Sequence, residues 1–208
     1  MNEKQRRVFD LIEKLQALGQ SGLHYGHDDY DKDRYQRVRE IAAEIAAVVT
    51  EDPLENVEKV FLADNGYQTP KMDTRAVVFN DEDKVLLVHE TSGLWALPGG
   101  WVDVGESVKS NTAKEAREEA GAIVEPRRLI AVVDKKGRRQ TRGPFSVFTF
   151  FVECDYLGGE FEDNLETTEC GWFGADELPE LAAGKNNAAQ LALCFEAHAD
   201  PDWRPLFD

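Results

Sequence analysis

The sequence predicts an α/β fold, with a mixed sheet between helices in an α/β/α sandwich, preceded by a small helical extension. Apolar residues recur at helical spacing through the first fifty residues. Short runs rich in β-branched and aromatic residues follow, on both sides of one central helical stretch, and another helical stretch lies near the end. A chain of 208 residues has room for an ordinary domain plus an appendage. We therefore expect an extension at residues 1–66 and the main domain at residues 67–208.

The extension is predicted to hold two amphipathic helices. The first should run from Lys4 to Leu18 and end near Gly19, where a loop rich in Gly, His and Asp begins. The second should span Arg34 to Val49, with apolar residues along one side. Two helices of this size bury too little surface to be stable alone. They should pack on the rest of the protein or on a second copy.

Strand signals dominate after a linker at residues 51–71 that holds one short helical or extended piece. Arg75 to Phe79 and Val85 to Val88 flank a polar turn and predict a hairpin. Later runs predict strands at Leu94 to Leu97, Trp101 to Val104, Leu129 to Val133, Phe145 to Cys154 (ended by Gly158-Gly159) and Trp172-Phe173. The central helix should cover Ser107 to Ala120 and stop at Gly121, and a terminal helix should cover Asn187 to His198.

Composition excludes several classes of protein. The formal charge of -16 argues against a nucleic-acid partner, because such partners usually meet a basic surface. No run of about eighteen apolar residues is present, so we expect no membrane partner. The three cysteines, Cys154, Cys170 and Cys194, are widely separated and lack zinc-site spacing, and the first residues show no apolar signal core. These features predict reduced thiols in a cytoplasmic protein.

The central helix carries Glu115, Glu118 and Glu119 at positions i, i+3 and i+4, so that their side chains share one face. Like charges at this spacing destabilise an isolated helix by a few tenths of a kcal/mol per pair. A hard divalent cation would offset that repulsion, and carboxylate and carbonyl oxygens suit Mg²⁺. Glu115 and Glu119 are the strongest candidate ligands, and Glu118 and the Gly100 carbonyl are further ones. The alternative is a solvated acidic face.

The wider spacing resembles the signature of the Nudix hydrolases. That signature, read as Gly, five residues, Glu, seven residues, Arg-Glu-aliphatic-X-Glu-Glu-X-Gly-aliphatic, falls on Gly100, Glu106, Lys114, Glu115, Ala116, Glu118, Glu119, Gly121 and Ala122. The departures are Lys114 in place of arginine and two alanines in place of larger apolar residues. Lysine keeps the charge but loses the planar fork of arginine. We expect this change to alter the geometry of the site more than its chemistry.

The resemblance implies a role for each residue of the signature. The helix glutamates Glu115, Glu118 and Glu119 would bind the metal, Mg²⁺ or Mn²⁺ as a substitute, and a glutamate would orient or deprotonate the attacking water. Glu106 would support the loop and the site. Because the catalytic base varies in this family and sometimes lies outside the signature, Glu166 and Glu169 are further candidates.

Substrate recognition is less specific in the sequence. Lys135 and Arg139 belong to a basic stretch that also contains Lys136, Arg138 and Arg142, and this stretch either clamps a diphosphate or forms a solvated turn. Arg75 lies within a strand and either binds substrate or pairs with a nearby acid. Trp95 and Trp101 either stack on a base or pack in the core.

The N-terminal part resembles the helical extension of Nudix enzymes that act on X-linked nucleoside diphosphates. The resemblance rests on residues 15–23, 30–35 and 41–44, and on their place before residues 70–75. It implies a homodimer and a small nucleotide substrate such as CDP-choline, a UDP-linked compound or ADP-ribose, split into a nucleoside monophosphate and a phosphorylated remainder. Two alternatives stay open, namely sanitation of nucleoside triphosphates and a non-catalytic module that senses nucleotides.

Overall fold

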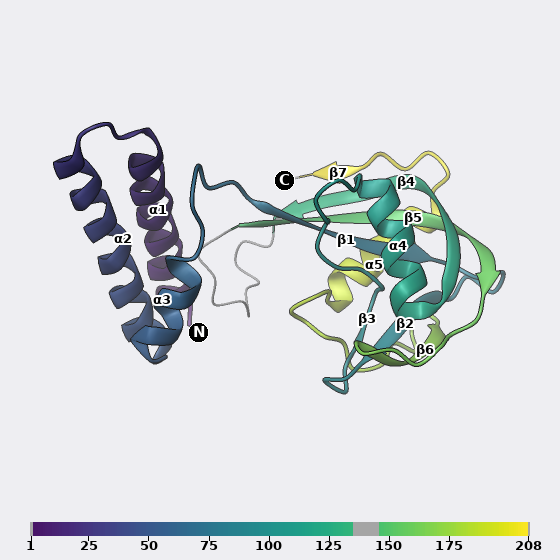
Figure 1. The fold of residues 1–208 in the computed structure, drawn as a ribbon. Helices are drawn as coiled ribbons and strands as arrows, with labels where there is room; N and C mark the ends of the chain where they lie inside the picture. Colours follow the sequence, from purple (N-terminus) through teal and green to yellow (C-terminus); the bar gives the residue numbers. More distant parts are fainter. Residues whose placement is uncertain (1, 135–145, 208) are drawn as a thin grey trace. The chain divides into compact units, whose positions relative to one another are not determined.

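The computed structural model describes residues 2–134 and 146–207, which form two compact units (Figure 1). The first unit lies within residues 1–70 and contains three helices. The second unit begins at Lys71 and contains all the described strands and two further helices. Among the described helices, none has the length and apolar character needed to cross a membrane.

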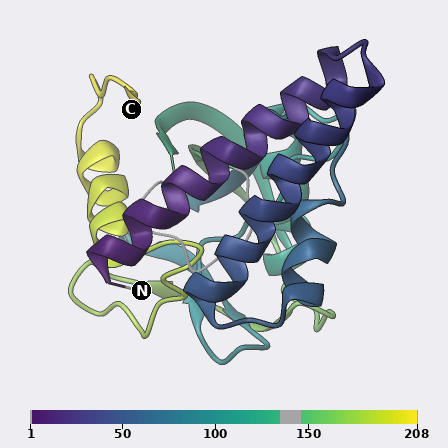
Figure 2. The ribbon, with the colours of Figure 1, turned by 90° about the vertical axis from the view of Figure 1, so that its left-hand side faces the viewer.

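The first unit is a pair of long helices with a short third helix packed against them. Helix α1 spans Glu3–Tyr25, α2 spans Asp29–Thr50 and α3 spans Leu54–Phe61. The two long helices lie side by side (Figure 2), and Asp28 caps α2 by accepting hydrogen bonds from the next turn. Their shared core consists of Phe9, Ile12, Ala42, Ala43, Ala46, Val57 and Phe61. The expectation of two amphipathic helices is confirmed.

The predicted end of the first helix near Gly19 is wrong, because α1 continues to Tyr25. Gly19 and Gly22 face α2 at very close range. A Cβ atom on Gly22 would lie 2.3 Å from the ring of Tyr35, and one on Gly19 would lie 2.8 Å from the Cγ atom of Arg39. These glycines therefore permit close packing of the two helices and do not end α1.

The second unit contains two sheets. The larger sheet has the order β1-β5-β4-β7, formed by Lys71–Val78, Val147–Gly159, Ala122–Asp134 and Leu206–Phe207. Strands β1 and β5 are parallel, whereas β4 and β5 are antiparallel, so this sheet is mixed. The smaller sheet has the order β3-β2-β6, formed by Trp95–Ala96, Val85–Glu90 and Thr167–Phe173.

Two helices cover opposite sides of these sheets, which confirms the predicted α/β/α sandwich (Figure 1). Helix α4, Val108–Ala120, packs Ala116 and Ala120 against one layer of buried strand residues. Helix α5, Ala188–Ala199, packs Leu191 and Cys194 against the other layer. Alternate residues of the strands feed the two cores, as expected for strands buried on both faces.

Three strand predictions need correction. The expected hairpin is limited to its turn, where Phe79 pairs with Val85, because β1 and β2 then enter different sheets. Residues 101–104 form no strand and contribute one bridge, between Trp101 and Asp73. Strand β5 continues through Gly158 and Gly159, whose φ angles of 121° and 119° are accessible mainly to glycine.

Candidate active site

Helix α4 presents the predicted glutamates because both of its ends are well capped. The Ser107 side chain accepts a hydrogen bond from the backbone N–H of Ser110, at 3.1 Å, and the Ser110 side chain in turn accepts from the Ser107 backbone. Gly121 ends the helix in the left-handed conformation, with φ of 64°. The buried alanines hold one face of α4 on the sheet, and the glutamates extend from a neighbouring face into the pocket.

The loop that carries Gly99 and Gly100 lies against these glutamates. The Gly99 N–H donates a hydrogen bond of 2.8 Å to Oε2 of Glu119. A Cβ atom on Gly99 would lie 2.0 Å from the carbonyl oxygen of Thr74, and one on Gly100 would lie 2.7 Å from Oε2 of Glu115. A side chain at position 99 would therefore push the loop off the strand, and one at position 100 would displace the Glu115 carboxylate. The two glycines let backbone and carboxylates approach closely.

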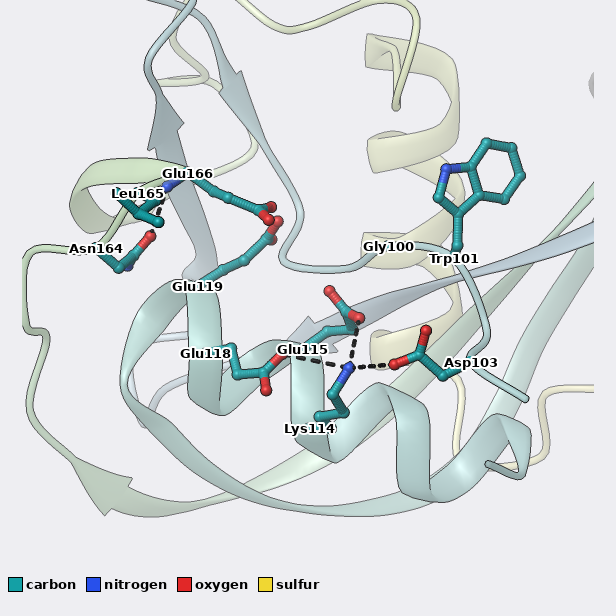
Figure 3. Close-up of a pocket in the computed structure, with 10 residues that line it drawn as sticks. All are labelled: Gly100, Trp101, Asp103, Lys114, Glu115, Glu118, Glu119, Asn164, Leu165 and Glu166. Carbon is teal, nitrogen blue, oxygen red and sulfur yellow. Dashed lines mark hydrogen bonds and ion pairs between the residues drawn. The ribbon is translucent and has the colours of Figure 1, made fainter. Parts of the chain in front are cut away.

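A pocket of about 550 Å³ opens between this loop, α4 and the segment before β6 (Figure 3). Its lining residues are Gly100, Trp101, Asp103, Lys114, Glu115, Glu118, Glu119, Asn164, Leu165 and Glu166. The candidate metal ligands named from the sequence, Gly100 and the three helix glutamates, thus line one cavity together with Glu166. Glu166 comes from the segment facing α4, and its side chain extends into the pocket.

Lys114 lies among the carboxylates of this pocket (Figure 3). Its Nζ atom is 2.7 Å from Oδ2 of Asp103, 3.4 Å from Oε2 of Glu118 and 3.7 Å from Oε1 of Glu115. The hydrogen bond with Asp103, together with the nearby glutamates, raises the pKa of Lys114 and keeps it charged. One lysine therefore neutralises part of the charge of three carboxylates.

Burial raises the pKa of the two inner glutamates, Glu115 and Glu119. Glu119 is 4% exposed, and burial raises its pKa to about 7, although the Gly99 N–H favours the charged form. Burial also raises the pKa of Glu115. Two carboxylates are thus held where their negative charge is poorly compensated by protein groups alone. A bound cation would compensate it.

The donor set fits a hard divalent cation, since the carboxylates of Glu115, Glu118 and Glu119 supply only oxygen. In the part of the chain that the structure describes, however, no three His, Cys, Asp or Glu side chains are gathered as a ready-made metal site. The reason is visible in the geometry, because Glu119 is turned toward the Gly99 N–H and Glu118 toward Lys114. The Gly100 carbonyl accepts a hydrogen bond of 2.9 Å from the Thr74 N–H, which leaves it a second lone pair.

Other candidate residues lie outside the pocket. Glu106 is exposed in the turn before α4, and Glu169 is exposed on β6. Arg75 is buried and pairs with Asp73 at 3.1 Å, while its guanidinium also donates to the Leu97 and Gly99 carbonyls. Trp95 packs against the core, with its ring 4.8 Å from that of Phe173. Lys135 and Arg139, with the rest of the basic stretch, lie outside the described residues.

The sequence predictions missed three residues of the pocket, namely Asp103, Asn164 and Leu165. Asp103 lies within the variable part of the signature, where spacing carries no information. Asn164 precedes Glu166 by two residues, a position from which an Asn side chain can bond the following backbone. Trp101, which the sequence placed either at a base or in the core, is half exposed at the pocket.

Comparison with known proteins identifies the family. The family described as the NUDIX domain matches residues 69–194, which is more than half of the chain. The chain belongs to the Nudix hydrolases. A second family, described as a UDP-X-like, N-terminal oligomerisation domain, matches residues 6–61. The Nudix hydrolases generally use a divalent metal, in agreement with the oxygen donors of the pocket.

Three known proteins are similar to this Nudix hydrolase in sequence or structure. It is 34% identical over 209 residues to "Putative ADP-ribose pyrophosphatase YjhB" of Bacillus subtilis (strain 168), with both chains covered completely. A crystal structure of an ADP-ribose pyrophosphatase from Streptococcus suis 89-1591 is 51% identical with a TM-score of 0.62, and covers 67% of this chain and 100% of its own. A crystal structure of UDP-X diphosphatase is 29% identical with a TM-score of 0.62, and covers 97% of this chain and 98% of its own.

Proposed function

We propose that this Nudix hydrolase is an Mg²⁺-dependent pyrophosphohydrolase that splits a nucleoside diphosphate linked to another group. The observation that carries the proposal is the single pocket in which Glu115, Glu118, Glu119 and Glu166 meet. The relatives support the substrate class, because two are named for ADP-ribose and one for UDP-X. ADP-ribose is therefore the first substrate to test, and CDP-choline and UDP-sugars follow.

The reaction needs an aligned water and positive charge on the phosphoryl oxygens. The water oxygen forms a bond to one phosphorus, the bond between that phosphorus and the bridging oxygen breaks, and a carboxylate takes the proton of the water. ADP-ribose would give AMP and ribose 5-phosphate. A magnesium ion, when bound, would supply Lewis acidity and lower the pKa of the water.

The residues of the pocket divide these tasks. Glu115 and Glu119 would hold the cation, with Glu118 as a further ligand, and the Gly100 carbonyl lies beside them. Glu166 extends from the opposite wall and would take the proton of the water. Lys114 would add positive charge close to the diphosphate, where Asp103 holds it.

The test is a substrate panel with the purified chain and MgCl₂, comparing ADP-ribose, a UDP-sugar, CDP-choline and nucleoside triphosphates, with the products separated by chromatography. We expect turnover of a linked diphosphate, formation of a nucleoside monophosphate, and ¹⁸O from labelled water in one product. Glu119→Gln serves as the inactive control. Preferred hydrolysis of triphosphates would support the sanitation alternative, and nucleotide binding without turnover would contradict catalysis.

We also infer that the chain forms a homodimer through its helical unit. The match to an N-terminal oligomerisation domain supports this, and so does an apolar stripe on α1. Leu11, Leu15 and Leu18 recur at i, i+4 and i+7 and are 52%, 39% and 63% exposed. Exposed leucines on one helix face are typical of an interface.

The oligomer can be tested by light scattering coupled to gel filtration. Leu18→Glu should convert the dimer to a monomer, because it places a charge within the apolar stripe. Ala63→Glu adds the same charge at an exposed position of the same unit and should remain dimeric. A wild-type monomer, or a Leu18→Glu dimer, would contradict the inference.

A further inference from the structure

The segment that carries Glu166 is tied to the end of α4 by two side chains, Asn164 and Thr167. Oδ1 of Asn164 accepts the backbone N–H groups of Glu166 and Thr167, at 3.0 and 2.9 Å. Its Nδ2 donates to the Thr167 hydroxyl at 2.7 Å. Figure 3 shows the first of these bonds at the wall of the pocket. One amide thus shapes the turn from which Glu166 extends.

The Thr167 hydroxyl extends this hydrogen-bond network to α4, the helix proposed to bind the metal. It donates a hydrogen bond of 2.6 Å to the backbone carbonyl of Glu119, in the last turn of α4. Carbonyls there lack a partner within the helix, so the bond satisfies an otherwise orphaned acceptor. Thr167 is 1% exposed, which shields the bond from water. The backbone of Glu119 and the turn before Glu166 are therefore joined through one buried hydroxyl.

The donors and acceptors of this network are mutually consistent. The hydroxyl has one proton, which goes to the Glu119 carbonyl, so it must accept from the Asn164 amide. Rotating the amide by 180° would place its NH₂ group against two backbone N–H groups. The Glu166 carbonyl also accepts from the Thr91 N–H at 3.2 Å, so both sides of Glu166 are held.

We propose that Asn164 and Thr167 are positioning residues, which hold the carboxylate of Glu166 in register with the glutamates of α4 during hydrolysis. The proposal rests on the proposed diphosphate hydrolysis and adds two residues outside the Nudix signature. Glu115 and Glu166 line the same pocket from opposite walls, so the two carboxylates face the same space. The hydrogen bonds of Asn164 and Thr167 hold the Glu166 segment near Glu115 despite the repulsion between the two carboxylates.

Thr167→Val tests the proposal because valine keeps the shape of threonine but lacks the hydroxyl. We expect kcat to fall about ten- to hundredfold with KM almost unchanged, because misplacing a catalytic group by about 1 Å costs this much. Thr167→Ser restores the hydroxyl and should recover most of kcat. Thr168→Val removes the neighbouring hydroxyl, which bonds His89 and does not reach α4, and should keep the wild-type rate.

A double-mutant cycle separates positioning from a general loss of structure. If the two residues act through Glu166, adding Thr167→Val to Glu166→Gln should lower kcat little further. Asn164→Ala should behave in the same way. Additive losses, or a Thr167→Val enzyme with the wild-type kcat, would overturn the positioning role while wild-type turnover still supports the proposed function. Absence of wild-type turnover on every linked diphosphate would instead overturn the proposed function.

Discussion

Two buried carboxylates of the Nudix unit, Glu119 on α4 and Glu153 on β5, differ in how fully their charge is compensated. Glu153 is 2% exposed, and its carboxylate forms ion pairs with Arg128, with Arg127 at 3.1 Å and with His198 at 2.8 Å. Burial alone would raise its pKa, but the hydrogen bonds from His198 and Arg128 outweigh it and hold the pKa below its usual value. Glu119 is buried to a similar degree and receives one backbone N–H, and its pKa is raised to about 7.

We propose that this difference in pairing distinguishes a structural carboxylate, Glu153, from a metal-binding one, Glu119. The partners of Glu153 fill its acceptor positions, and Arg128 also donates to the Ala197 and Asp200 carbonyls at the end of α5. Glu153 thereby joins β4, β5 and α5. Glu119 keeps acceptor capacity on its carboxylate and lines a pocket with other carboxylates. We infer that a fully paired buried carboxylate stabilises the fold, whereas an incompletely paired one can bind a cation.

Glu119→Gln should show the largest effect. We expect kcat to fall at least about a hundredfold, because an amide is a weak ligand for a hard cation.

Without metal the variant should be more stable than the wild type at pH 8, where the buried carboxylate is ionised at a cost. Since burial raises the folded pKa from 4.5 to about 7, this advantage should shrink as the pH falls below 7 and vanish below pH 4.5, where Glu119 is protonated in both the folded and the unfolded state. Steady-state kinetics and urea unfolding in EDTA check both statements. A variant with the wild-type rate at limiting Mg²⁺ would contradict the ligand role.

Glu153→Gln should have the opposite effects, lowering stability while leaving activity almost unchanged. We expect a loss of about 2 kcal/mol in the free energy of unfolding at pH 7, because Arg128 and His198 lose their charged acceptor. The depressed pKa of Glu153 means that its stabilisation is present above pH 4.5 and is lost as the pH falls through the folded pKa. The gap between variant and wild type should therefore close in acid, while kcat stays within about twofold at pH 7. A gap that is unchanged between pH 7 and pH 3 would count against the ionic role.

Lys114→Met should have the smallest effect. Removing the ammonium leaves Asp103, Glu115 and Glu118 less neutralised beside an anionic substrate. We expect KM for the diphosphate to rise about three- to fivefold, since partly exposed charge pairs contribute little. Lys114→Arg keeps the charge and should stay close to the wild type. If both variants change KM equally, charge is not the property that matters at this position.

The sequence was sufficient to predict α4, its C-terminal cap and the grouping of its glutamates, because these depend on local spacing. The helix ends at Gly121 as predicted and begins one residue after the predicted Ser107, which is its N-cap. Glu166 lies on the same pocket, although its role remains a prediction. The failures involve contacts between distant segments. Gly19 resembled a helix end in sequence, but its role is set by the side chains of α2 that pack against it.

Thr167 could not be found from spacing, because its partner on α4 lies far along the chain. Asp103 and Asn164 bond nearby residues, but the fold alone brings them to the pocket. Thr167 bonds the Glu119 carbonyl across 48 residues. The sequence does not show how differently Glu119 and Glu153 are paired, because the partners of Glu153 lie on other elements of the fold. Only the folded arrangement shows that Arg128 and His198 converge on Glu153.

The most direct test of the central claim is the shift in unfolding temperature caused by MgCl₂ at pH 7.5. The wild type and Glu153→Gln should be stabilised by the same increment, because both keep the carboxylates of the pocket and a ligand that binds the folded state stabilises it. Glu119→Gln should show little or no shift. An equal shift in all three proteins would contradict the claim that the incompletely paired carboxylate of Glu119 binds the metal.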